Sequence, residues 1–145
     1  NLRQSFQQII HPFIEKIFHN NIQLALIIRN EYSCEKNDIN FFTPNSFSQQ
    51  IGYMNRPKNY EITPHIHKQV KREVLYTNEV LFIKKGLIQV DFYDDEKVFL
   101  ESRVLKTGDL ILLIKGGHGF KFLEESELFE VKQGPYLGQD DKATF

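Results

Sequence analysis

The sequence predicts an all-β domain in which short antiparallel strands form a sandwich or a barrel. About ten apolar runs, each bounded by turn residues, follow one another from residue 22 to residue 133, with no helix-spaced pattern between them. Thirteen Phe and six Tyr, together with many Ile and Leu, favour strands. The 145 residues suffice for one domain, so we expect a single domain over residues 1–145.

The first segment, residues 1–20, has a different pattern. Its apolar side chains recur at gaps of three and four positions, which is the spacing of one helical face. Pro12 interrupts the pattern, because a proline inside a helix removes one backbone hydrogen bond. We therefore expect a short N-terminal helical segment, broken or restarted at Pro12, that packs over the core or against a second copy.

The strands that we expect are short and closely spaced. "LIQVDFYD" and "VFLESRVL", joined by "DDEK", are typical of a hairpin. The tail, residues 134–145, contains two Gly and one Pro and is expected to form a C-terminal arm. The apolar runs place strands at residues 22–30, 39–43, 48–55, 60–67, 73–77, 79–86, 87–94, 98–105, 109–115, 119–124 and 127–133.

Charge and cysteine content exclude several classes of function. Eighteen Lys and Arg against nineteen Asp and Glu give a net charge of −1, so we expect no nucleic-acid partner and no membrane partner. No apolar run is long enough to span a membrane. Cys34 is the single cysteine and is expected to be an inert thiol. Without a disulfide or a signal-peptide pattern over the first residues, we expect a cytoplasmic protein.

Two histidines, His65 and His67, lie one residue apart in "PHIH". In a strand, residues i and i+2 point to the same face, so both imidazoles can converge on one metal ion. The same spacing also fits two surface histidines that bind no metal.

Glu79 and His118 extend the candidate site. Glu79 opens the apolar strand "EVLFIKKG", where burial of a carboxylate is costly unless a cation or another partner compensates it. His118 lies in the glycine-rich turn "KGGHG" between two apolar strands. A divalent cation would be a suitable partner for this carboxylate.

These residues together resemble the cupin family of small double-sheet jelly-roll barrels. "PHIH", "EVLFIKKG" with six residues between Glu and Gly, and "GDLILLIKGGHG" are similar to the two cupin motifs over residues 51–132, the expected barrel core. The resemblance implies that His65, His67, Glu79 and His118 are metal ligands. It implies one divalent ion, which could be Fe, Mn, Ni, Co or Zn.

The chain departs from the cupin pattern in three places. Residues 68–78 separate the His pair from Glu79, where cupins usually have three or four residues, and this insert contains Glu73 as a less suitable ligand. Ile114 replaces a usual Pro, and Phe122 occupies the position of a usual Asn. The role of the 68–78 insert stays open.

Three functions are consistent with these residues. The first is a metal-dependent oxygenase or isomerase that acts on a small molecule at a site of three His and one Glu. The second is a non-catalytic module that binds a small molecule or a sugar. The third is a metal-free protein similar to the sugar-nucleotide isomerases and epimerases. The sequence names no catalytic residue and does not decide whether the protein is an enzyme. The family resemblance also implies a homodimer.

Overall fold

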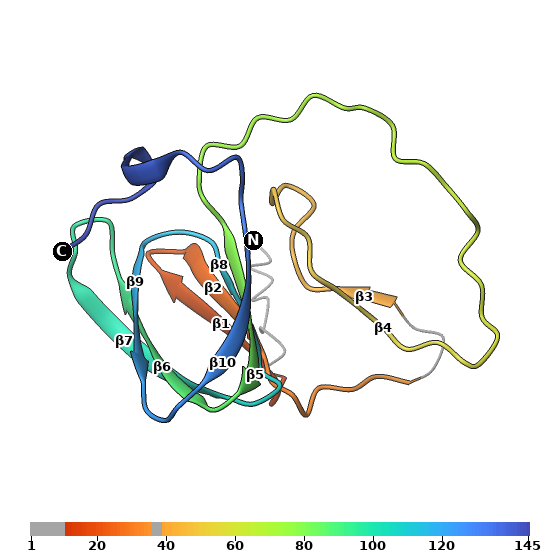
Figure 1. Ribbon diagram of the computed structural model, residues 1–145, viewed down its shortest axis with the longest axis horizontal. Coiled ribbons are helices and arrows are strands. Elements are labelled where there is room, and N and C mark those ends of the chain that lie inside the picture. The colour runs from red at the N-terminus through yellow and green to blue at the C-terminus, as the bar shows by residue number, and fades with distance from the viewer. Residues whose placement is uncertain (1–10, 36–38) are drawn as a thin grey trace, which may run out of the picture.

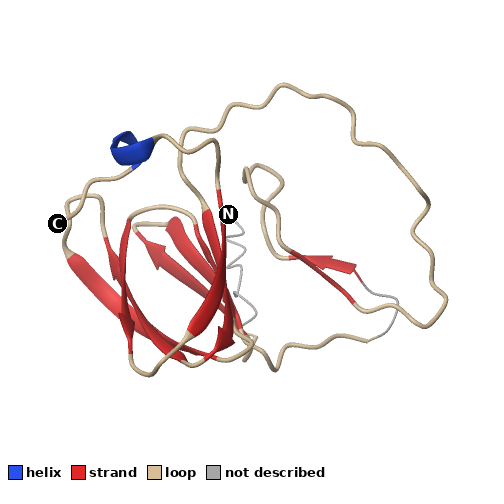
Figure 2. Ribbon diagram, viewed as in Figure 1, coloured by secondary structure: helices blue, strands red, loops and turns tan. Residues whose placement is uncertain are grey.

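The computed structural model describes residues 11–35 and 39–145, and within them the chain is all-β, as predicted (Figure 2). No helix in these ranges is long and apolar enough to cross a membrane. A short 3-10 helix, η1, follows the last strand. The elements are β1 (Ile14–His19), β2 (Ile22–Ile28), β3 (Ile39–Phe41), β4 (Gly52–Met54), β5 (Glu79–Lys85), β6 (Leu87–Tyr93), β7 (Phe99–Lys106), β8 (Leu110–Leu113), β9 (Gly117–Phe122), β10 (Glu127–Lys132) and η1 (Gly138–Asp141).

Two antiparallel sheets face each other as a β-sandwich (Figure 1). One sheet has five strands in the order β1-β2-β8-β5-β10, and the other has three in the order β7-β6-β9. Among the described residues, β9 and β10 are therefore the terminal strands of their sheets, and no strand pairing joins the two sheets along this side. The sandwich is open between β9 and β10.

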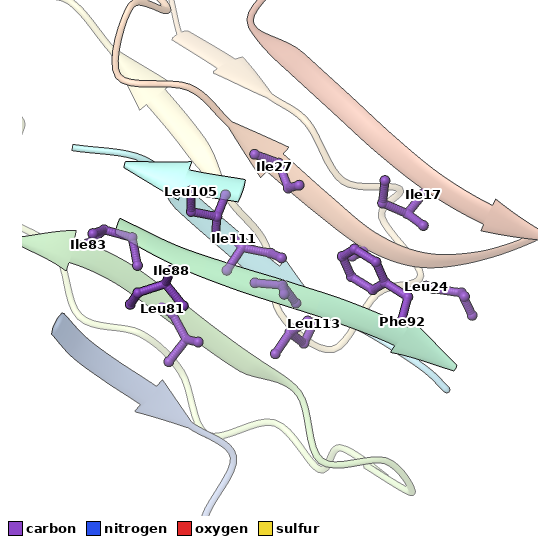
Figure 3. Close-up of a cluster of buried hydrophobic side chains, with 12 residues drawn as sticks. Ile17, Leu24, Ile27, Leu81, Ile83, Ile88, Phe92, Leu105, Ile111 and Leu113 are labelled. Carbon is purple, nitrogen blue, oxygen red and sulfur yellow. The ribbon is translucent and has the colours of Figure 1, made fainter. Parts of the chain in front are cut away.

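The core lies between the two sheets (Figure 3). Alternate residues of each strand point inward, so Leu81 and Ile83 of β5 meet Ile88 and Phe92 of β6 across the gap. All four are at most 4% exposed, so water is excluded from the space between the sheets at this level. Further members of this cluster are Ile17, Leu24, Ala25, Ile27, Val90, Leu105, Ile111 and Leu113.

A second apolar cluster lies on the outer face of the five-stranded sheet. Leu26 and Leu112 are buried there under Phe42, Phe47 and Ile51. The three covering residues belong to the flap, residues 39–54, which consists of β3, β4 and their connection. The flap explains why β2 and β8 are apolar on both faces, a pattern that a two-layer sandwich with a solvated outer face would not require.

The predicted N-terminal helix is wrong within the described residues, because Ile14–His19 forms β1. The remainder of that prediction, residues 1–10, lies outside the described residues. Asn20 and Asn21 have φ values of +49° and +61° and connect β1 to β2 as a two-residue hairpin turn. The apolar spacing of residues 14–19 fits either a helix or a strand. The turn at Asn20 and Asn21 and the pairing of β1 with β2 favour the strand.

Two other predicted strands are also wrong. Residues 60–67 and 73–77 form no sheet pairing, and every residue from 57 to 76 is exposed. This segment, which we call the arm, leaves the flap and arcs away from the two sheets before it returns to β5 (Figure 1). The other predicted strands are present, although the structure shortens most of them.

Candidate functional site

Glu79 and His118 come together at the open side of the sandwich, although they are far apart in sequence. Glu79 is the first residue of β5 and shares the inward face of Leu81. His118 lies on β9 directly opposite Phe92 of β6, so its ring also points between the sheets. Nε2 of His118 lies 3.4 Å from Oε2 of Glu79. The structure thus brings two of the four candidate site residues into contact.

The pair is largely shielded from water. The side chains of Glu79 and His118 are 15% and 27% exposed. Contact with the His118 imidazole holds the pKa of Glu79 below its usual value, against the opposing effect of burial. Glu79 is therefore a carboxylate near neutral pH, which is the form that binds a cation.

Lys132 and Asp141 adjoin the pair, and sequence reasoning missed both. Lys132 lies directly opposite Glu79 in the β5–β10 register, and its Nζ is 4.0 Å from Oε1 of Glu79 and 3.4 Å from Oδ2 of Asp141. The hydroxyl of Thr77 donates a hydrogen bond to Oδ1 of Asp141 at 2.5 Å. No sequence signal marks these residues, because their proximity follows from strand register and from the course of the C-terminal segment.

The C-terminal segment returns across the end of the sandwich beside His118. The Phe145 ring packs edge-on against Tyr93, with 5.0 Å between the ring centroids. A Cβ atom at Gly117 would lie 2.9 Å from Cζ of Phe145 and 3.1 Å from Cβ of Tyr93. Glycine next to His118 therefore lets the tail approach β9 closely, which is one physical reason for the glycine-rich turn.

His65 and His67 lie in the exposed arm, away from the Glu79–His118 pair (Figure 1). Their rings are 5.1 Å apart between centroids, so they share one side of the extended chain, as predicted for residues i and i+2. Nδ1 of His65 lies 2.8 Å from the carbonyl oxygen of Thr63. Across residues 11–35 and 39–145, a single chain brings no three His, Cys, Asp or Glu side chains into an arrangement that could hold a metal ion.

The four predicted ligands thus form two pairs instead of one cluster. The Glu79–His118 pair fits half of a metal site, because two atoms that each lie about 2.1 Å from the same ion are separated by about 3.0–3.4 Å. Its donors, one imidazole nitrogen and one carboxylate oxygen, suit a first-row divalent metal. The two arm histidines, which the sequence predicts as the remaining nitrogen donors, do not join this pair within a single chain in the described residues.

Comparisons with protein-family models, with curated proteins and with solved structures found no match to this chain. A function for this chain is therefore inferred from its fold and its side-chain geometry alone.

Proposed function

We propose that this protein is a metal-binding jelly-roll barrel of the cupin type that binds or transforms a small molecule. The observation that carries the proposal is the 3.4 Å contact between Glu79 and His118, held at the open side of a β-sandwich. Both residues occupy positions of the two cupin-like motifs, and the sheets place them on facing strands. One divalent ion, held by Glu79 and His118 with His65 and His67, is the cofactor of this proposal.

The chain's own residues would prepare such a site in two ways. The partly buried Glu79 supplies a negative charge where the lowered pKa keeps it ionised. Lys132 provides a cation 4.0 Å from the same carboxylate and could attract an anionic group of a ligand. When bound, the metal would supply Lewis-acid or redox chemistry.

The free Cys34 and the absence of any other cysteine in the sequence are compatible with a cytoplasmic protein.

A metal-free acid–base function is the second candidate, and the Glu79–His118 contact also favours it. A carboxylate that orients an imidazole can make that imidazole a general base, with Lys132 close enough to stabilise negative charge. This chemistry suits proton transfer on a sugar or a similar carbonyl compound. It would need Glu79, His118 and Lys132 but neither arm histidine.

Metal analysis distinguishes the two candidates. We expect the wild-type protein, after reconstitution with Fe, Mn, Ni, Co or Zn, to retain about one ion per chain on desalting. Substitutions Glu79→Gln and His118→Ala should each lower metal affinity by at least tenfold. Glu127→Gln, on the exposed part of β10, and His19→Ala, on β1, are the matched controls and should leave metal content unchanged. Circular dichroism checks that each variant remains folded.

A wild-type protein that retains none of these metals would overturn the metal proposal and leave the acid–base candidate. Full metal content in His65→Ala/His67→Ala would show instead that the arm histidines are not ligands.

A further inference from the structure

A cavity of about 350 Å³ lies between the flap and the outer face of the five-stranded sheet. Its apolar walls include Ile51 of the flap, Val80 of β5, Leu110 of β8 and Val131 of β10. Val131 is 61% exposed, so the cavity opens to solvent at β10. We call this space the flap cavity. Its volume lies near the lower end of the range of small-molecule sites, so it suits a small ligand.

The flap cavity is separate from the Glu79–His118 pair. Glu79 and Lys132 contact each other between the two sheets. Side chains alternate along a strand, so the neighbouring residues Val80 and Val131 point to the outer face of the same sheet. The two valines are directly opposite each other in the β5–β10 register. The cavity and the pair therefore lie on opposite faces of β5.

Three buried side-chain amide oxygens have no hydrogen-bond donor among the described residues. They are Oε1 of Gln49, Oδ1 of Asn78 and Oε1 of Gln133. The Asn78 residue as a whole is only 6% exposed. Burial of an amide oxygen without a donor is costly, and buried polar atoms in proteins generally have a partner. Three such atoms indicate a bound group that supplies donors.

Strand pairing brings these oxygens to one end of the flap cavity. Gln49 is itself part of the cavity wall. Nδ2 of Asn78 donates a hydrogen bond to Oγ of Ser48 at 2.5 Å, which holds the flap residue next to Gln49 against the start of β5. The backbone N–H of Gln133 donates to the carbonyl oxygen of Asn78 at 3.0 Å, so this residue continues β10 beside β5. Alternation turns the side chains of Asn78 and Gln133 to the outer face, where the cavity lies.

A primary ammonium group matches these acceptors. It carries three N–H donors and no acceptor, whereas a carboxylate would place its oxygens against other oxygens. The apolar walls suit a short hydrocarbon chain attached to the ammonium group. The opening at Val131 keeps the charge partly hydrated, which reduces the cost of removing a cation from water.

We propose that the flap cavity binds a small primary amine, with the ammonium group at the three amide oxygens and the hydrocarbon part against the apolar walls. The flap forms one wall, so a bound amine should also hold the flap on the sheet. This site needs no metal and does not rest on the proposed function.

Binding of n-butylamine to the full chain tests the proposal. This probe is an ammonium ion at neutral pH, and n-pentanoate is a carboxylate of similar length. We expect n-butylamine to shift the backbone amide resonances of Ile51, Val80 and Val131 in a saturable way, with the weak affinity of a very small ligand. We expect n-pentanoate to leave them unchanged. Lack of saturation by n-butylamine, or equal binding of n-pentanoate, would overturn the proposal.

Substitution of the acceptors tests the position of the ammonium group. Gln49→Leu/Gln133→Leu removes two acceptors at similar side-chain volume and keeps the hydrogen bond between Asn78 and Ser48. The affinity for n-butylamine should fall by at least about tenfold, because hydrogen bonds to a charged group are strong. Gln89→Leu, on β6 of the other sheet, is the matched control and should leave the affinity unchanged. Circular dichroism checks that each variant remains folded.

A change in the opposite direction separates binding from a structural role. Gln133→Glu places a carboxylate beside the ammonium group and should raise the affinity for n-butylamine. Loss of affinity in this variant, or unchanged affinity in the double Leu variant, would overturn the proposed position.

Two further measurements test the apolar walls and the kind of cation. Val131→Phe should narrow the cavity and weaken binding, whereas Val98→Phe, at a 55% exposed position before β7, should not. Equal affinities in these two variants would contradict the placement of the hydrocarbon part. Amide oxygens also suit hard metal ions. Shifts of the same resonances by Ca²⁺, with no response to n-butylamine, would overturn the amine proposal.

Discussion

The carboxylate of Asp109 is completely buried and accepts a hydrogen bond from Nη1 of Arg29 at 2.9 Å. Backbone N–H groups of Asn30 and Lys106 donate to the same carboxylate at 2.8 and 2.9 Å. Arg29 also donates to Glu15 at 2.5 Å, so strands β1, β2 and β7 and the turn before β8 meet at this point. Asp109 belongs to the "GD" pair of the second cupin-like motif, and its role here is structural.

Removal of the Asp109 carboxylate should destabilise the fold strongly. Asp109→Ala removes one acceptor of Arg29 and the side-chain acceptor of two backbone N–H groups, and loss of one partner of a buried ion pair costs about 3–5 kcal/mol. Glu31→Gln is the control, because Glu31 contacts Lys106 at an exposed site where water screens the ion pair. Urea unfolding measures both free energies. Similar losses in the two variants would refute the structural role.

Acid should weaken the fold partly through Asp109. Burial opposes ionisation of this group, but the hydrogen bonds from Lys106, Asn30 and Arg29 hold its pKa below the usual value. A lowered folded-state pKa contributes stability above the unfolded-state pKa, about 3.9, and this contribution is lost as the pH falls through the folded-state value. Thermal unfolding between pH 7 and pH 3 should therefore show a weaker pH dependence in Asp109→Asn than in the wild type. Parallel curves would contradict this expectation.

Phe92 should be among the most stabilising core residues. Its ring is 1% exposed and packs between the two sheets (Figure 3). Phe92→Ala should lower the free energy of unfolding by about 3–5 kcal/mol, because it removes apolar contacts and leaves a cavity. Phe99→Ala on β7, where the ring is 55% exposed, should cost much less. Chemical denaturation measures the difference, and equal costs would indicate that the sheets pack differently.

The β1–β2 turn should tolerate glycine but not valine. Asn20 has a φ of +49°, a left-handed conformation that glycine adopts freely and that a β-branched side chain adopts at a cost. Asn20→Gly should therefore change stability little, whereas Asn20→Val should lower it by about 1–2 kcal/mol. Thermal melting of the two variants tests the hairpin directly. A helix at this position would give the opposite order, because glycine is the weaker helix former.

Several features of the fold could be predicted from local sequence. Alternating apolar residues and turn signals sufficed to predict β5, β6, β7 and β8. The alternation of side chains along a strand depends only on neighbouring residues, so it can be recognised in the sequence. For residues 14–19 the same reasoning gave a helix, since apolar spacing there fits both structures and pairing with β2 decides between them. Residues 60–67 have a strand pattern that the single chain leaves unpaired.

The sequence by itself determined the all-β class and most strands, and it singled out His65, His67, Glu79 and His118 as candidate ligands of one site. Only the tertiary structure decided that Glu79 and His118 are 3.4 Å apart, that Lys132 adjoins them, and that His65 and His67 lie elsewhere. Motif spacing describes distance along a chain, whereas ligand convergence depends on which strands share an edge. Strand order and register set that proximity, and both arise from packing between distant segments.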